Sequence, residues 1–323
     1  MVRILFITTD ENNNLHAVDR AQGDYFENLA LIGLRELLGD NCVDYPRKKI
    51  LYGDFSSVPK SSLHGQGFSL YHKPIKDISD EARLASEFDI MLYGTVMSWN
   101  MKPLPELEAK CKSIFYIDGN DLYGVAQNNK YIHYNGEILI GNQMTPSFKG
   151  QIIAEDPDVY PIGTSIPESR ILSIDLSQKY QLFQNSYPRY AFFETPDEVN
   201  RKHHIYNNEE EYYSDLSRSW FGLTCKRGGW DAMRHCEIIA AGTLLLYRDY
   251  HLKPPYCAPV NLPTISYSSK SDLIEIMDRL VVNNKPTTEY VDLLLAQRSW
   301  LTQTATTLAR ANYMLKILKG YYV

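Results

Sequence analysis

The sequence predicts an α/β protein with two units, each built around a parallel β-sheet. Apolar runs that suit buried strands alternate with segments of helical spacing twice along the chain, before and after a proline-rich stretch at residues 144–170. Parallel strands need long crossovers, and helices usually supply them. A chain of 323 residues with 44% apolar residues can form two units of ordinary size. We expect a first unit over residues 1–165, a second over 166–286, and a helix over 287–323.

The first unit begins with a strand, a helix and a second strand. Residues 2–8 are a continuous apolar run, residues 21–38 carry apolar side chains at helical spacing, and residues 42–45 fit another strand. The elements predicted further along this unit are a strand at 88–94, a helix at 105–112, a strand at 113–119 and a hairpin at 131–140. This order implies a parallel sheet covered by helices.

The second unit repeats the alternation. Its predicted strands lie at 190–194, 220–224, 243–247 and 264–267, and its predicted helices at 209–218, 231–241 and 271–280. Asp231 is the expected cap of the middle helix, and Ser271 or Asp272 that of the last. Apolar residues recur at three- and four-residue steps from Thr287 to Lys319, which predicts one long helix at the end of the chain.

Composition and charge narrow the class of protein. The formal net charge of −6 gives no support for general binding of nucleic acid or anionic membranes. Five cysteines without a C-x-x-C spacing indicate neither a disulfide scaffold nor a structural zinc site, and they suit a reducing compartment. The first residues indicate a strand rather than a signal peptide, and no apolar run reaches the length of a membrane span. We therefore expect a cytoplasmic protein.

The segment from Phe221 to Gly242 is the most informative part of the chain. It is typical of a strand, a turn with Gly228 and Gly229, and a helix. A helix N-terminus presents free N–H groups and partial positive charge, and glycine lets a ligand approach the backbone, so the turn suits a phosphate group. Lys226 and Arg227 add positive charge, and arginine binds phosphate oxygens in pairs. The turn is therefore a predicted diphosphate site.

Three further side chains complete this predicted site. Arg234 lies three residues before Glu237, so both share a face of the helix, and Glu237 can accept hydrogen bonds from ribose hydroxyls. Trp230 can stack on a base or a sugar. The alternatives are a surface ion pair for Arg234 and Glu237 and core packing for Trp230. The predicted donor-binding residues are Lys226, Arg227, Gly228, Gly229, Trp230, Arg234 and Glu237.

This segment resembles the donor-binding motif of glycosyltransferases with the GT-B fold, above all exostosin-like domains and bacterial group-1-type transferases. The positions that carry the resemblance are Cys225, Arg227, Gly228, Arg234, Glu237 and Gly242. The departures from the pattern are Lys226, His235 and residues 244–246. The resemblance implies two Rossmann-like domains that face a cleft and a C-terminal helix that crosses back to the first domain. It also implies a nucleotide-sugar donor in the second domain, held without a cofactor or metal ion.

The implied reaction moves a sugar from a nucleotide-diphosphate donor to an acceptor that the sequence does not identify. The acceptor classes that we consider are a glycan, a lipid-linked sugar and a modified nucleobase. The cations of the motif would stabilise the charge of the leaving diphosphate. An inverting enzyme also needs a general base near the acceptor hydroxyl. Ligands of α/β sheets bind at the carboxyl ends of strands, so the candidates follow strands of the first unit. They are Asp118 and Asp121, then Asp19, His16 and Asp10.

Three alternatives stay open. A non-catalytic nucleotide- or sugar-binding protein would keep the second domain without acceptor chemistry, and a sugar-nucleotide epimerase would use the same fold. Asp156-Pro157-Asp158 matches the D-x-D metal motif of single-domain GT-A transferases, which would make the enzyme metal-dependent. Besides the nucleotide sugar and its acceptor we expect no stable nucleic-acid complex, and the sequence leaves peripheral membrane contact and a homodimer open.

Overall fold

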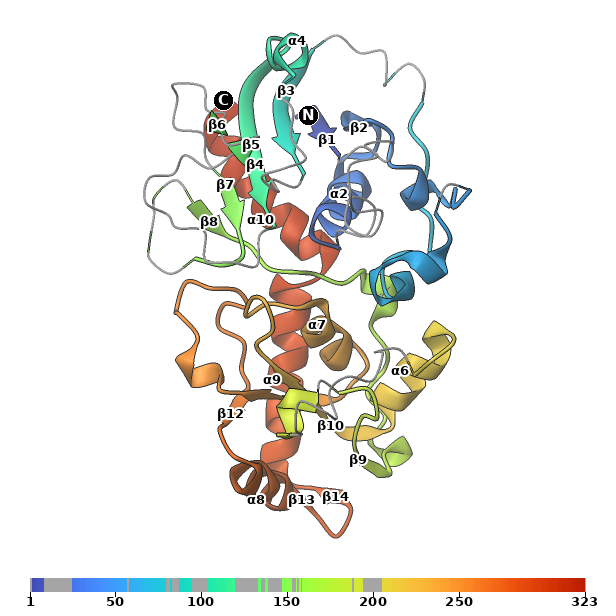
Figure 1. Ribbon diagram of the computed structural model, residues 1–323, viewed down its shortest axis with the longest axis vertical. Coiled ribbons are helices and arrows are strands. Elements are labelled where there is room, and N and C mark those ends of the chain that lie inside the picture. Colours follow the sequence, from blue (N-terminus) through green and yellow to red (C-terminus); the bar gives the residue numbers. More distant parts are fainter. Residues whose placement is uncertain are drawn as a thin grey trace.

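The computed structural model contains two parallel sheets, which are stacked along the long axis of the molecule (Figure 1). The described residues are 2–8, 25–56, 58–79, 82, 87–94, 104–119, 133–134, 137–138, 147–152, 155, 157, 159–187, 189–193 and 205–322. Each sheet and its helices form a Rossmann-like domain, as the sequence predicts. The first domain holds the strands up to residue 161, and the second holds those from residue 181 to residue 267.

Six of the described strands form the sheet of the first domain, all parallel, in the order β2-β1-β3-β4-β7-β8. They are β1 (Ile4–Ile7), β2 (Cys42–Tyr45), β3 (Phe88–Tyr93), β4 (Cys111–Asp118), β7 (Ser147–Lys149) and β8 (Val159–Pro161). Every residue of β1 is buried, as expected for an apolar strand between two neighbours. β7 and β8 lie in the proline-rich stretch, so this sheet continues further along the chain than the sequence predicts.

Four described strands form the second sheet, again all parallel, in the order β12-β11-β10-β9. They are β9 (Gln181–Phe183), β10 (Ser219–Cys225), β11 (Leu244–Arg248) and β12 (Ile265–Tyr267). The strand predicted at 190–194 is wrong, because residues Arg189–Phe192 form a 3-10 turn and Phe193 has a φ of 61°. β9 takes the edge position, and the Gln184 side chain extends its pairing by bonding both backbone groups of Leu223.

The helices largely follow the sequence prediction, but their caps differ. They are α2 (Tyr25–Leu38), α4 (Pro105–Glu108), α6 (Glu209–Ser217), α7 (Met233–Ala240), α8 (Lys270–Leu280), α9 (Thr288–Thr304) and α10 (Thr307–Tyr322). The cap of α7 is Ala232, which makes no side-chain cap bond, and the Asp231 carboxylate accepts instead from the Thr164 N–H. The cap of α8 is Ser269, whose side chain accepts from the Asp272 N–H.

Two small antiparallel pairs complete the described strands. The predicted hairpin is present as β5 (His133–Tyr134) and β6 (Glu137–Ile138), while β13 (Val281–Val282) and β14 (Lys285–Pro286) lead into α9. Gly222 of β10 lies against α7. A Cβ at Gly222 would lie 2.2 Å from Ile238 Cγ2, so only glycine lets α7 pack this closely on the strand.

The end of the chain crosses back to the first domain, as the resemblance predicts (Figure 1). The single helix predicted over 287–319 is two helices, because the backbone of Ile166 pairs with Ala305 and Thr307 where α9 ends. α10 then packs on α2, where a Cβ at Gly33 would lie 2.2 Å from the Thr307 carbonyl oxygen. Within the described part of the chain, no helix combines the length and the apolar character that a membrane crossing requires.

Candidate functional site

The loop between β10 and α7 lies at the carboxyl edge of the second sheet, where open α/β sheets bind ligands. β10 ends at Cys225 and α7 begins at Met233, so residues 226–232 form the turn that the sequence predicts. Lys226, Arg227 and Gly228 are exposed. The Arg227 N–H donates to the Gly229 carbonyl over 3.1 Å, which keeps the turn tight. Two cationic side chains therefore stand at the edge of the sheet.

The carboxyl edge of the first sheet meets this turn. Gln151, two residues after β7, accepts a hydrogen bond of 3.0 Å from the Trp230 N–H. The Cys257 thiol lies 3.0 Å from the Ile152 carbonyl, and the Ala258 N–H donates to the Gly150 carbonyl over 2.8 Å. Figure 1 shows β3 and β4 pointing toward the second domain. The two sheets therefore turn their carboxyl edges toward each other.

Two further arginines stand at this edge. Arg234 on α7 donates to the Ser186 carbonyl, which follows β9. Arg248 is the last residue of β11, with its guanidinium carbon 3.9 Å from the centre of the Phe193 ring and Nε 3.3 Å from Asp249 Oδ2. Arg248 was not predicted from the sequence, although its place at the end of an apolar run was a usable signal. With Lys226 and Arg227, these arginines concentrate positive charge where an anion could bind.

Glu237 is almost fully buried and makes two short hydrogen bonds. Its Oε1 accepts from Ser69 Oγ over 2.5 Å, and its Oε2 accepts from the Tyr212 hydroxyl over 2.6 Å. Burial raises the pKa of the carboxyl group, while these two hydrogen bonds and the charge of Arg234 act in the opposite direction. Ser69 belongs to the first domain and Tyr212 to the second. Glu237, the residue predicted to bind the ribose, is therefore hydrogen-bonded by both domains. No sequence signal connected Ser69 with this site.

Trp230 packs in the core rather than projecting from the turn. Its ring is 5% exposed and lies 6.1 Å, centre to centre, from the ring of Tyr247, whose hydroxyl donates to the Trp230 carbonyl over 2.5 Å. The Lys226 ammonium lies 5.3 Å from the centre of the Trp230 ring. The structure thus supports the packing alternative, and Trp230 fixes the base of the turn.

Asp118 lies at the end of β4, as predicted, and its carboxylate forms an ion pair with Lys149 at the end of β7. Both side chains are largely buried. The other base candidates, Asp121, Asp19, His16 and Asp10, lie outside the described residues, as do Asp156 and Asp158. The GT-A alternative also implies a single-domain fold, which the two separate sheets contradict.

A cluster of buried polar side chains behind the turn was also not predicted from the sequence. Asp231 Oδ1 lies 3.8 Å from His235 Nδ1, and His235 Nε2 lies 3.1 Å from Thr224 Oγ1. Burial alone would raise the pKa of Asp231, but the nearby His235, the Thr164 N–H and the charge of Arg310 outweigh this effect and lower the pKa. Thr164 and Arg310 come from the two crossovers between the domains. The cluster therefore ties the turn to both connections.

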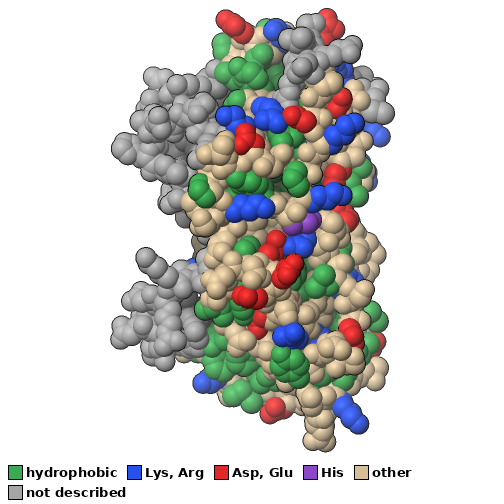
Figure 2. All heavy atoms as spheres, turned by 90° about the vertical axis from the view of Figure 1, so that its right-hand side faces the viewer, with side chains coloured by type: hydrophobic (Ala, Val, Ile, Leu, Met, Phe, Trp, Pro, Cys, Tyr) green, Lys and Arg blue, Asp and Glu red, His purple; other side chains and the backbone are tan. Residues whose placement is uncertain are grey.

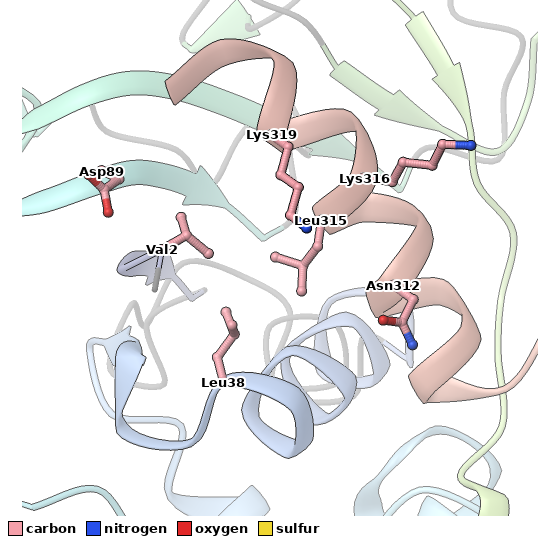
Figure 3. Close-up of a pocket in the computed structure, with 7 residues that line it drawn as sticks. All are labelled: Val2, Leu38, Asp89, Asn312, Leu315, Lys316 and Lys319. Atoms are coloured by element: carbon pink, nitrogen blue, oxygen red, sulfur yellow. The ribbon is translucent and has the colours of Figure 1, made fainter. Parts of the chain in front are cut away.

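A hollow lined by described residues lies elsewhere (Figure 3). It has a volume of about 700 Å³ and lies between the end of α2 and the face of α10. Its lining residues are Val2, Leu38, Asp89, Asn312, Leu315, Lys316 and Lys319. Val2 precedes β1, so this hollow is at the amino edge of the first sheet, opposite the edge where the predicted residues gather.

Comparison with solved structures decides the fold. The crystal structure of Anabaena Alr3699/HepE in complex with UDP and glucose superposes with a TM-score of 0.50 at 8% identity, covering 99% of this chain and 100% of that chain. AviGT4, a glycosyltransferase involved in avilamycin A biosynthesis, gives 0.51 at 10% identity and covers 99% and 97%. The chain has the GT-B fold.

The GT-B fold is shared more widely than one reaction. The N-terminal domain of a Candida albicans trehalose-6-phosphate phosphatase superposes equally well, with a TM-score of 0.51 at 10% identity and coverage of 99% and 97%. No protein-family model matches the sequence, and no curated protein matches it by sequence. At such low identity the GT-B likeness establishes architecture alone, so function has to be argued from the site.

Proposed function

We propose that this protein is a glycosyltransferase that moves a sugar from a nucleoside-diphosphate donor to an acceptor held by the first domain. The observation that carries the proposal is the position of Lys226 and Arg227, exposed on a tight turn at the carboxyl edge of the second sheet and opposite the matching edge of the first. A nucleoside diphosphate between the two edges would place its phosphates on the turn. The Anabaena neighbour, which was crystallised with UDP, supports this class of donor.

The chemistry follows from the charges at this edge. Cleavage of the bond between the sugar and the diphosphate leaves negative charge on the departing phosphate oxygen. Positive charge is in place there before the reaction begins, supplied by Lys226, Arg227, Arg234 and Arg248. These side chains lower the barrier without having to rearrange during the reaction. We therefore propose transfer without a metal ion or another cofactor, with the cations of the chain neutralising the leaving group.

The acceptor side is proposed to use a carboxylate of the first domain. Asp118 is our candidate within the described residues, while Asp121, His16 and Asp19 stay predictions. Taking a proton from an acceptor hydroxyl would cost Asp118 its ion pair with Lys149. An asparagine side chain cannot take up that proton. Asp118→Asn should lower kcat for transfer to an added acceptor while leaving donor affinity unchanged, if Asp118 is the base.

Turnover of the donor tests the proposal. UDP-glucose is the first substrate to try, because the Anabaena neighbour was crystallised with it at a TM-score of 0.50. We expect slow release of UDP even without an acceptor, reduced at least tenfold in Arg227→Ala, because arginine contributes charge-assisted bonds to phosphate. Arg218→Ala, an exposed arginine after α6, is the matched control. Tight UDP binding without release from any nucleotide sugar would favour the non-catalytic binding protein.

A further inference from the structure

A segment of the first domain docks on the second domain beside Glu237. This docking segment, residues 63–72, makes polar contacts through the side chains of Gln66, Ser69 and His72 and through the backbone of Ser69. Gln66 Nε2 donates to the Tyr206 carbonyl over 3.1 Å, and His72 Nε2 lies 2.6 Å from Ser169 Oγ. The Ser69 N–H donates to Glu209 Oε1 over 2.5 Å. These contacts join segments that are about 100 or more residues apart in the sequence.

Ser69 is the centre of the docking segment. It is fully buried, and its hydroxyl lies 2.5 Å from Glu237 Oε1 and 2.7 Å from the Tyr213 hydroxyl. The second carboxylate oxygen of Glu237 accepts from the Tyr212 hydroxyl. Each oxygen therefore holds one hydroxyl group. A ribose also presents two adjacent hydroxyls. The hydroxyls of Ser69 and Tyr212 therefore bind the carboxylate in the way that a ribose would.

The position of Ser69 is enforced by its surroundings. Its φ is 68°, in the left-handed region that residues other than glycine rarely adopt. Such a conformation persists where neighbouring contacts determine it. Arg170 supplies one such anchor, because it pairs with Glu209 and lies over the Tyr213 ring at 4.8 Å. Figure 2 shows acidic and basic side chains across the middle of the molecule on this side, where the two domains meet.

We propose that Ser69 occupies the ribose position of the donor site, so that the docking segment and the nucleoside compete for Glu237. The inference rests on the proposed function. Lys226 and Arg227 stay exposed while Glu237 is covered, so the diphosphate binds first and the ribose engages only after Ser69 has left. The donor affinity of the whole protein is then reduced by the fraction of molecules in which the docking segment is in place.

Titration calorimetry with two probes tests this competition. UDP carries the ribose, and inorganic pyrophosphate carries only the charges that the turn would bind. Ser69→Ala removes the hydroxyl, and Ser69→Gly removes it while also suiting the positive φ, so at least one variant should fold normally. Ser62→Ala is the control, because Ser62 is exposed and its hydroxyl donates to the nearby Pro59 carbonyl. We expect both Ser69 variants to bind UDP about tenfold more tightly, with pyrophosphate affinity and the control unchanged.

The outcomes separate this inference from the function it rests on. If wild-type protein binds UDP and neither Ser69 variant binds it more tightly, the competition is wrong and the transferase proposal stands. If UDP and pyrophosphate affinity rise together, the segment closes the whole edge, and the assignment of Ser69 to the ribose position is overturned. If neither the wild type nor the variants bind either probe, both proposals fall.

Discussion

Tyr212 donates a hydrogen bond of 2.6 Å from its hydroxyl to Oε2 of Glu237, and both side chains are buried. Burial raises the pKa of Glu237. The hydroxyl groups of Tyr212 and Ser69 oppose that shift, because they donate hydrogen bonds that stabilise the charged carboxylate. Hydrogen bonds to a charged buried group are stronger than those between neutral groups. The stability of the second domain and the state of Glu237 are therefore linked.

Replacing this donor should destabilise the protein in a pH-dependent way. Tyr212→Phe removes one hydroxyl from Glu237 and should lower the free energy of unfolding by about 2 kcal/mol at neutral pH. The pKa of Glu237 should rise further, so the loss should shrink at acid pH as the carboxyl group becomes protonated. Urea denaturation between pH 5 and 8 measures it, with the exposed Tyr180→Phe as control. A loss independent of pH would contradict this explanation.

Lys179 should make stability rise with pH. Burial lowers the pKa of its ammonium group to about 7. Nζ donates hydrogen bonds to neutral groups, namely the carbonyls of Ser217 and Ser219 and the hydroxyl of Thr243. The unfolded chain keeps that proton up to about pH 10. Between these values the unfolded state holds more protons, so the free energy of unfolding increases as pH rises and is lowest below pH 7.

Lys179→Met provides the comparison. Between pH 7 and pH 9 the wild type should gain about 2 kcal/mol more stability than the variant. Denaturant unfolding at several pH values measures both proteins. Parallel pH profiles would show that Lys179 titrates normally in the folded state.

The first domain contains an ion pair that should be costly to break. Lys48 Nζ lies 3.0 Å from Glu27 Oε1, and both side chains are fully buried. Glu27→Gln or Lys48→Met alone should lower the free energy of unfolding by about 3–5 kcal/mol, because each removes the opposite charge from beside a fully buried ion. The double variant should lose less than the sum. Arg279→Ala breaks an exposed pair with Glu289 and should change stability by less than about 1 kcal/mol.

Gly222 should be hard to replace. A Cβ there would lie 2.2 Å from Ile238 Cγ2, so Gly222→Ala should cost about 1–3 kcal/mol by pushing α7 away from β10. Gly320→Ala in α10 is the control, because a Cβ at that position meets nothing within 4 Å. Thermal denaturation of both variants measures the difference. Equal melting temperatures would mean that α7 adjusts without cost.

The sequence predicted the fold where a residue's own segment decides its structure. The buried strands β1, β3, β10 and β11 are dominated by apolar residues, and Gly228 and Gly229 mark the turn after β10. The resemblance added the crossing of the C-terminal helix. The short strands β7, β8 and β9 were missed; β9 has only Gln181–Phe183 and depends on its neighbour for pairing.

The candidate site was predictable only in part for the same reason. Lys226 and Arg227 belong to a local motif, and the structure leaves them exposed at the expected edge. The break between α9 and α10 depends on Ile166, which is over 130 residues away from Thr306 in the chain, and Ser69 reaches Glu237 across 168 positions. Contacts over such separations leave no local pattern in a single sequence. Trp230 is buried because Tyr247 covers it, which its own segment does not indicate.

Titration calorimetry of the full chain with UDP, in a chelator and again with Mg²⁺, tests the central claim most directly. The proposed site predicts saturable binding in the chelator, at least tenfold weaker in Arg227→Ala and unchanged in Arg218→Ala. Binding that appears only with Mg²⁺ would contradict a site built from the cations of the chain. Failure of UDP and of other nucleoside diphosphates to bind under either condition would contradict the nucleotide-sugar transferase itself.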